Sequence, residues 1–260
     1  MVEINRLREM DAQAESAEQR AVSSSAAPES GVSSHFWVST FPYFETTLVI
    51  TPPLYSLPLF SSTSSSSITS RLFFYDADGK LINDSSLETS SGAVSMLELD
   101  QFLGGCKLES GLKHAHLIVR SPAGTGHHCR IQGREYAAML GEPFRISAAK
   151  AGFFPVTFST DRSNLLTLIN YSMEEANLRC RLFLGKRCPE VVWSIPALGS
   201  RVINIEVEFR EYAEAKEGQQ LQAYLRVTTK SNGLGAQLVE RSESSSEQGA
   251  FVSGIFSSVS

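Results

Sequence analysis

The feature that most constrains the fold of this chain is a set of short apolar runs that recur 108 residues apart. Setting Ala115 on Ala223 aligns the alternating residues of HAHLIVR (114–120) with those of AYLRVTT (223–229). Two further pairs of segments match in the same order: 94–100 with 202–208 at the same offset, and 71–73 with 181–183 after a two-residue gap. Alternation with a period of two is typical of strands, and a repeat of this length has the size of a domain.

The rest of the chain is also typical of a β protein. Strand-like runs stand between clusters of Gly, Pro, Asn, Asp and Ser; further examples are TTLVIT (46–51), RLFFY (71–75), LLTLIN (165–170) and RVINIEVEF (201–209). Asp78-Gly79 favours a hairpin turn, and only 133–142 and 211–217 carry a hint of helix. We therefore predict an all-β fold, with two tandem β-sandwich-like domains at 35–142 and 143–260.

Residues 1–34 are expected to form a flexible tail, disordered or partly helical. Residues 3–21 have a helix-forming composition, but their apolar stripe is short, and the following stretch of small polar residues cannot form a core. A serine-rich stretch from Ser61 to Ser67 predicts a mobile loop inside the first domain.

The charge and cysteine content indicate a cytoplasmic protein without membrane insertion. The formal net charge of −5 argues against broad binding to nucleic acid. No apolar run approaches the roughly 18 residues of a membrane helix, and the first residues lack the apolar region of a signal peptide. The four cysteines form no CxxC pair, so we expect reduced thiols, two or three of them in the core.

The second half contains NLLTLINYSMEEANLRCRLFLG, then SIPALGS, RVINIEVEF and a closing GAFVSGIF. This order, with Asn170, the acidic turn at 174–176 and the segment from Ala236 to Arg241, resembles the sensory rhodopsin transducer family. The resemblance implies a small β-sandwich that forms a symmetric oligomer and acts by binding rather than catalysis. Members are soluble partners of a photoreceptor or have no known role, and ligand or DNA binding has been proposed for some. This chain differs in its duplication and its serine-rich loop, and no residue role is carried over.

Histidines cluster in the first domain. His114 and His116 share one face of a strand, about 6–7 Å apart, as the first ligands of many metal sites do. A third ligand would come from another strand, with Asp76, Asp78 and Glu98 as possible donors.

The neighbouring His128 does not complete such a site in the expected geometry. If Pro122–Gly126 is a hairpin turn, His128 lies on the same face as His116 but roughly 13 Å away, too far for one metal ion. The other interpretation is a polar strand face exposed to solvent or to a subunit contact. The second copy has Gln222 and Tyr224 at the positions of His114 and His116, so the fold does not require histidine there.

Aromatic residues are dense between positions 35 and 60, and include Trp37 and Tyr43. Such residues pack cores, but they are also enriched in binding clefts and oligomer surfaces.

No catalytic motif stands out: GxSxG and GxGxxG are absent, and PAGTGHH (122–128) is interpreted as a hairpin loop. We predict a non-enzymatic ligand- or protein-binding module that acts as a homo-oligomer. Its partner is an unknown protein or small ligand, signalling is one of the roles considered for it, and no cofactor is expected. The expected ligand-binding residues are His114, His116, Trp37 and Tyr43. The alternative is a metal-dependent enzyme of cupin-like β architecture that uses His114 and His116.

Overall fold

The computed structural model describes residues 31–40, 44–52, 67–90, 93–109, 112–133, 137–213, 219–231, 233–242 and 251–253. The predicted tail up to residue 30, most of the serine-rich loop and Tyr43 lie outside these residues. The first strand begins at Gly31, four residues before the start that we predicted for the first domain. Among the described residues, no helix has the length and apolar character needed to span a bilayer.

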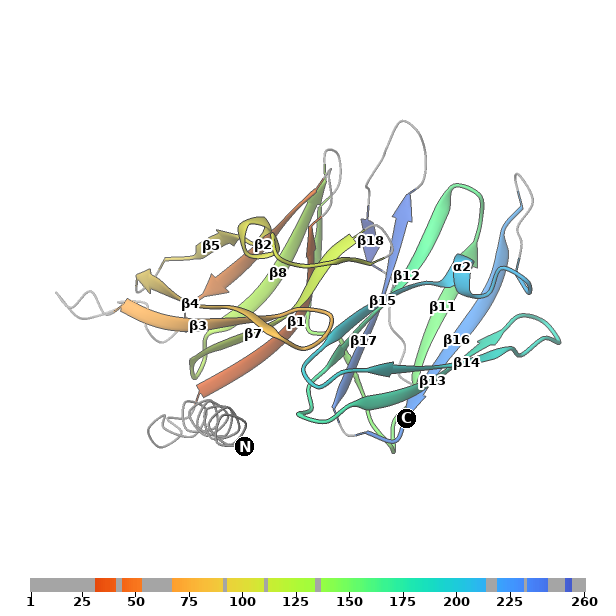
Figure 1. Ribbon diagram of the computed structural model, residues 1–260. Helices are drawn as coiled ribbons and strands as arrows, with labels where there is room; N and C mark the ends of the chain where they lie inside the picture. Colours follow the sequence, from red (N-terminus) through yellow and green to blue (C-terminus); the bar gives the residue numbers. More distant parts are fainter. Residues whose placement is uncertain are drawn as a thin grey trace, which may run out of the picture. The chain divides into compact units, whose positions relative to one another are not determined.

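Two sheets contain the strands of the first sandwich (Figure 1). Sheet A has the order β1 (Gly31–Thr40), β7 (Leu112–Pro122), β3 (Ser67–Tyr75) and β4 (Leu81–Ser90), with β6 (Leu108–Glu109) paired to β7. Sheet B has the order β5 (Ser95–Glu98), β2 (Phe44–Thr51), β8 (Gly126–Gly133) and β9 (Ala137–Leu140). A 3-10 turn, η2 (Asp100–Phe102), follows β5.

The second sandwich is also built from two sheets. Sheet C has the order β10 (Phe144–Ile146), β17 (Leu234–Ser242), β12 (Arg162–Asn170) and β15 (Ser200–Asn204), with β18 (Phe251–Ser253) paired to β17. Sheet D has the order β11 (Gly152–Phe158), β16 (Leu221–Thr229), β13 (Ala176–Phe183) and β14 (Glu190–Ile195). A short helix, α2 (Ile205–Glu208), follows β15.

The strand order of sheet D repeats that of sheet A, and β15-β12-β17 repeats β5-β2-β8. In sheet A, Phe74 stands opposite Leu117, and in sheet D, Leu182 stands opposite Leu225. Both pairs are related by 108 residues, so the two-residue gap that we expected between 71–73 and 181–183 is wrong. The alternation that revealed the repeat is therefore a property of paired strands in two copies of one unit.

The run 201–209 is not one strand. Strand β15 ends at Asn204, whose side-chain oxygen accepts a hydrogen bond from the backbone N–H of Val207 and so caps α2. Val207 is 59% exposed, whereas Leu99, its predicted counterpart, is fully buried. The offset of 108 therefore does not extend to this segment. The hint of helix at 133–142 is also wrong where the structure describes it, because residues 137–140 form β9.

The stretch 122–126 is not a hairpin turn. Strand β7 pairs in sheet A, where His116 stands opposite Tyr75, and β8 pairs in sheet B, where His128 stands opposite Val49. The turn at 122–126 thus carries the chain from one sheet to the other, and the predicted pairing of β7 with β8 is wrong. The Asp78-Gly79 turn is confirmed, since it joins the paired strands β3 and β4.

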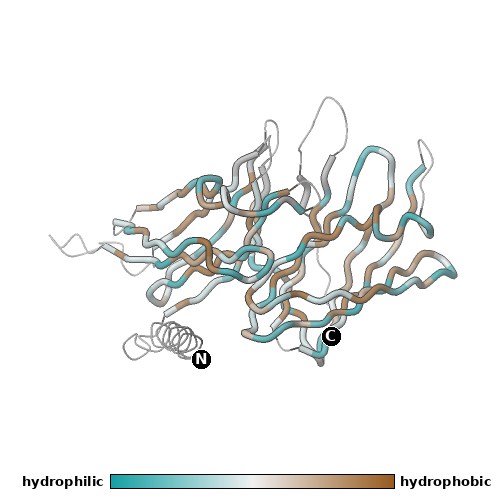
Figure 2. Tube along the Cα trace, viewed as in Figure 1, coloured by the Kyte–Doolittle hydropathy of each residue, from teal (hydrophilic) through white to brown (hydrophobic). Residues whose placement is uncertain are grey.

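Each sandwich encloses an apolar core, and polar and apolar residues alternate along many strands (Figure 2). Three of the four cysteines, Cys106, Cys129 and Cys180, are buried, as expected, and all four are free thiols. Strands β7 and β12 depart from the alternation, because most of their residues are buried, on both faces of the strand. A strand buried on both faces is covered by another layer on each side.

The second layer over β12 comes from the other sandwich. Leu165, Ile169, Val202 and Val239 belong to sheet C, yet they join the apolar cluster of the first sandwich, together with Trp37. The outer faces of sheets A and C therefore pack on each other and form what is called the sandwich interface below.

Candidate functional site

Strand β7 aims its histidines at the sandwich interface. Ala115, Leu117 and Val119 point into the first core, so His114 and His116 point to the opposite face, as the alternation predicts. Their exposed fractions are 1% and 0%. The two histidines thus share a face, but this face packs on the second sandwich of the same chain instead of meeting solvent.

His114 lies between two partners. Its Nδ1 is 2.9 Å from the Ser200 hydroxyl, and its Nε2 is 2.6 Å from a carboxylate oxygen of Glu109. The same oxygen accepts a bond from the N–H of Val202, and the ring of Trp37 stacks on His114 with the centroids 6.0 Å apart. A serine, a histidine and an acid in series have the connectivity of a nucleophilic triad. Ser200 is only 2% exposed, however, so this arrangement links the two sandwiches and offers a substrate no access.

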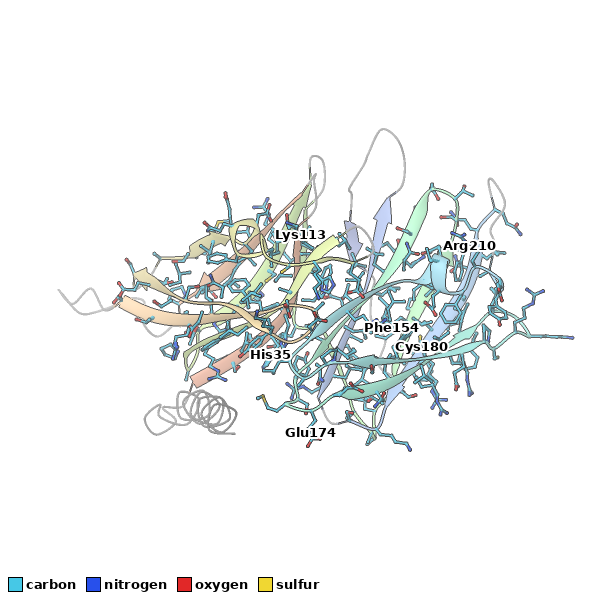
Figure 3. All side chains as sticks on the ribbon, viewed as in Figure 1. His35, Lys113, Phe154, Glu174, Cys180 and Arg210 are labelled. Atoms are coloured by element: carbon cyan, nitrogen blue, oxygen red, sulfur yellow. The ribbon has the colours of Figure 1, made fainter. Side chains whose placement is uncertain are left out.

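His116 connects three segments of the chain. Its Nδ1 is 2.8 Å from the Leu198 carbonyl, so Nδ1 carries the proton and donates it. Its Nε2 must then accept the hydrogen bond from Nδ1 of His35, 2.9 Å away on β1 (Figure 3). Burial lowers the pKa of His116 to about 3 and, with Arg145 and Arg120 nearby, that of His35 to about 4. Both rings are therefore neutral at pH 7.

These contacts bear on the metal hypothesis. Both nitrogens of His114 and of His116 already have partners, and the described residues contain no group of three His, Cys, Asp or Glu side chains arranged to hold a metal ion. Of the possible third donors, Asp76 caps the β3–β4 turn and Asp78 pairs with Lys107. Within the residues that the structure describes, no third ligand joins His114 and His116.

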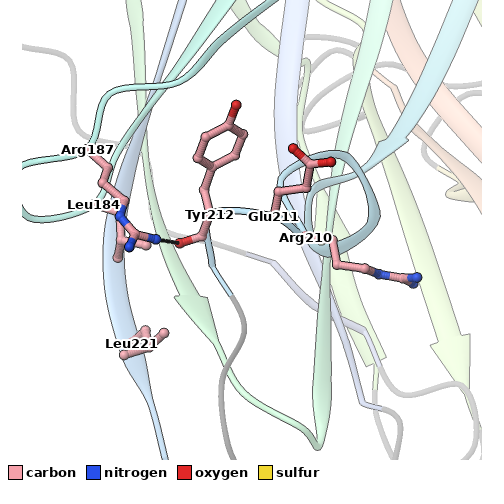
Figure 4. Close-up of a pocket in the computed structure, with 6 residues that line it drawn as sticks. All are labelled: Leu184, Arg187, Arg210, Glu211, Tyr212 and Leu221. Atoms are coloured by element: carbon pink, nitrogen blue, oxygen red, sulfur yellow. Dashed lines mark hydrogen bonds between the residues drawn. The ribbon is translucent and has the colours of Figure 1, made fainter.

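A pocket of about 600 Å³ lies at one end of the second sandwich (Figure 4). Its lining is Leu184, Arg187, Arg210, Glu211, Tyr212 and Leu221. The Arg187 guanidinium donates a hydrogen bond of 3.2 Å to the Tyr212 carbonyl. The guanidinium of Arg210 points away from Arg187 (Figure 4). Binding sites usually have polar groups that converge on the ligand, and those of this pocket do not.

Charged groups do converge on the outer face of sheet D. Arg179 and Arg181 are two residues apart on β13, and Arg181 stands opposite Arg226 of β16 on one side and Glu190 of β14 on the other. Together with Thr228 they line a depression of about 250 Å³. We call these three arginines and Glu190 the arginine face.

Glu190 is the acid of this face. Its Oε2 accepts bonds from Nε and Nη2 of Arg181 at 3.0 and 2.6 Å, and its Oε1 lies 3.1 Å from Nε of Arg179. Arg226 rests over the Phe153 ring at 5.8 Å, and no carboxylate of the described residues lies within 4 Å of it. Three positive charges against one negative leave a surplus of positive charge at a solvent-exposed surface.

Sequence reasoning missed the arginine face. The alternation in LRCRLF places Arg179 and Arg181 on one side of a strand, which was a usable signal. Arg226 joins them only through the pairing of β13 with β16, which the sequence does not display. Of the other predicted site residues, Trp37 is buried in the sandwich interface and Tyr43 lies outside the described residues.

Comparisons with known proteins add little. No family model and no curated protein matches the sequence. Among solved structures, an anti-sigma factor domain-containing protein is similar over 85% of this chain and 82% of its own, with 11% identity and a TM-score of 0.22. The β-glucuronidase 2 of Bacteroides uniformis is similar over 85% of this chain and 26% of its own, with 8% identity and a TM-score of 0.17. TM-scores this low carry no argument about fold or function.

Proposed function

We propose that this chain is a non-enzymatic binding module that recognises an anionic partner on the arginine face of its second sandwich. The observation that supports the proposal is the convergence of Arg179, Arg181 and Arg226 on one depression with a single acid, Glu190. The formal net charge of the chain is −5, so this surplus of positive charge is local. Arginine forks match carboxylate and phosphate groups with two parallel hydrogen bonds, which makes arginine the usual residue for recognising anions.

The test is a panel of anions added to the full chain, with thermal unfolding as the readout. Phosphate, sulfate, citrate and heparin are suitable probes. At least one should raise the melting temperature of the wild type, and the triple variant Arg179→Ala, Arg181→Ala, Arg226→Ala should lose this effect. Arg71→Ala is the matched control, because Arg71 is the counterpart of Arg179 in the first sandwich. A panel without any effect, or an equal effect on the triple variant, would overturn the proposal.

Self-association belongs to the same proposal, with a second copy of the chain as the partner. On the outer face of sheet B, Met96 and Met139 are 58% and 54% exposed. In the same face Thr47 stands between Glu98 of β5 and Arg130 of β8. A two-fold axis along β2 would set Glu98 against Arg130 of the partner subunit, so this face complements itself in charge. A signalling role, which the family resemblance implies, is part of this hypothesis.

The alternative remains a metal-dependent enzyme that uses His114 and His116. Elemental analysis of the purified full chain decides between the two hypotheses. Stoichiometric zinc, iron or manganese that disappears in the double variant His114→Ala, His116→Ala would support the enzyme.

A further inference from the structure

The arginine face has the geometry of a site for one tetrahedral anion. Neighbours two apart on a strand are about 6–7 Å from each other, and directly paired residues about 5 Å. Arg179 is two residues before Arg181 on the same strand, and Arg226 is paired directly with Arg181 on the next strand. The three guanidinium groups line one depression of about 250 Å³, which is smaller than the site of a drug-sized ligand. One compact group with several oxygens can reach all three arginines, whereas the separate charges of an extended dicarboxylate cannot.

Glu190 already occupies this site in part. It binds Arg181 through two N–H groups and lies beside Arg179, and its ion pairs among the described residues are with these two arginines and not with Arg226. One carboxylate among three guanidinium groups leaves two positive charges without a counter-ion. This surplus matches a dianion.

The first sandwich serves as an internal comparison. In the first sandwich, Arg71 and Asp84 stand at the positions of Arg179 and Glu190, and they also form an ion pair, at 3.0 Å. At the counterpart of Arg181 stands Phe73.

The counterpart of Arg226 in the first sandwich is Ile118, which is buried. The single ion pair is therefore common to both copies of the unit, and the two additional arginines belong to the second copy alone. The strand pairing of the unit does not depend on them, because the first copy forms the same pairing without them.

Tyr224 lies beside this cluster. It is two residues before Arg226 on β16, on the same face of the sheet, and 59% exposed. A flat ring attached to the anion can stack on this phenol ring.

On these grounds, and resting on the proposed function, we propose that the arginine face binds a phosphate monoester dianion, with Glu190 as a resident counter-ion that competes with it. The phosphate oxygens accept hydrogen bonds from Arg179, Arg181 and Arg226. Glu190 weakens the binding because its carboxylate occupies the same donors and repels the incoming charge.

Calorimetric titration of the full chain tests the proposal with two probes, inorganic phosphate and phenyl phosphate. Glu190→Gln should bind either probe about two- to fivefold more tightly, because an exposed ion pair of this kind no longer competes. Arg226→Ala should weaken binding by about tenfold, the contribution of one charge-assisted hydrogen bond. Asp84→Asn is the matched control in the first sandwich and should change nothing.

The two probes distinguish the source of the phosphate. Tighter binding of phenyl phosphate that is lost in Tyr224→Ala indicates an aromatic ester, and equal binding of both probes indicates the free ion. No heat with either probe in both the wild type and Glu190→Gln, or an unchanged affinity in Glu190→Gln, would overturn the phosphate proposal. If heparin or citrate still binds the arginine face in that case, the proposed function stands without this inference.

Discussion

His116 donates a hydrogen bond of 2.8 Å from Nδ1 to the carbonyl oxygen of Leu198, and this contact joins the two sandwiches. Leu198 has a φ of 55°, in the left-handed region that non-glycine residues rarely adopt. Such a backbone persists only where the surroundings hold it in place. The buried imidazole, fixed on its other nitrogen by His35, is one of the groups that hold this turn.

Replacing His116 with alanine should therefore destabilise the protein. The change removes the hydrogen-bond partner that His116 provides to the Leu198 carbonyl and to Nδ1 of His35, and it opens a cavity in the sandwich interface. We expect a loss of about 2–4 kcal/mol in the free energy of unfolding, measured in urea. Tyr224→Ala is the matched control, because Tyr224 is the exposed counterpart in the second copy and should cost about 0.5 kcal/mol or less. Equal effects of the two variants would contradict the assigned role of His116.

A second prediction concerns the β3–β4 turn where it meets the β14–β15 turn. Gly79 has a φ of 78°, and a Cβ at this position would collide with the carbonyl oxygen of Ala197. Gly79→Ala should thus cost about 2 kcal/mol or more, through backbone strain and steric overlap. Gly104→Ala, whose Cβ would meet no atom within 4 Å, is the control and should stay within about 0.5 kcal/mol of the wild type. Urea unfolding of both variants is the measurement.

The all-β fold and the repeat could be predicted from the sequence because they depend on local alternation. Inward residues of β7 and β16 show a period of two, and this period also places His114 and His116 on one face. Turn chemistry was less informative. The stretch 122–126 suits a hairpin, but the same residues connect β7 and β8 in different sheets, and only the long-range pairing decides between the two.

Several partners of the histidines and arginines could not be predicted, because they are distant in the sequence. Ser200 meets His114 across 86 residues, and Arg226 meets Arg181 only through strand pairing. The error at 201–209 has a different cause, because alternation favoured a strand there and the local capping signal of Asn204, which starts α2, was overlooked.

Stability should depend on pH through the buried histidines. Burial lowers the folded-state pKa of His116 to about 3 and of His35 and His127 to about 4, from an ordinary value of 6.5. Below pH 6.5 the unfolded chain therefore binds more protons than the folded chain, so the free energy of unfolding falls as the pH falls from 6.5 to about 4.

The size of this effect has an upper bound. Each group contributes up to about 1.4 kcal/mol per pH unit in this range, and the partly exposed His35 contributes less. Arg145 and Arg120 oppose protonation of His35. Glu142, which accepts a hydrogen bond from the His35 backbone, and Tyr171, which lies beside the ring, do not reverse the lowering of the His35 pKa. Urea unfolding at pH 7.5, 6.0 and 5.0 measures the slope. His35→Gln should make it shallower, and a pH-independent stability would rule out neutral, buried histidines.

The four thiols should react at very different rates in the native protein. Cys188 is exposed, whereas burial raises the pKa of Cys106 to about 11 and raises the pKa of Cys129 and Cys180 as well. Since the thiolate is the reacting form, an Ellman assay should find one fast thiol without denaturant and four in urea. Cys188→Ser should remove the fast phase, and a fast phase that survives this change would show that the core opens readily.

The last prediction tests whether two chains associate through the outer face of sheet B. If this face joins two chains, light scattering should give twice the 28.4 kDa of one chain. Met96→Glu should then give the mass of the monomer, because it replaces one of the two exposed methionines of this face with a charge two residues from Glu98. Val192→Glu introduces the same charge at an equally exposed apolar residue of sheet D and should leave the dimer intact. A monomeric wild type at micromolar concentration, or a dimer lost in Val192→Glu and kept in Met96→Glu, would exclude sheet B as the contact.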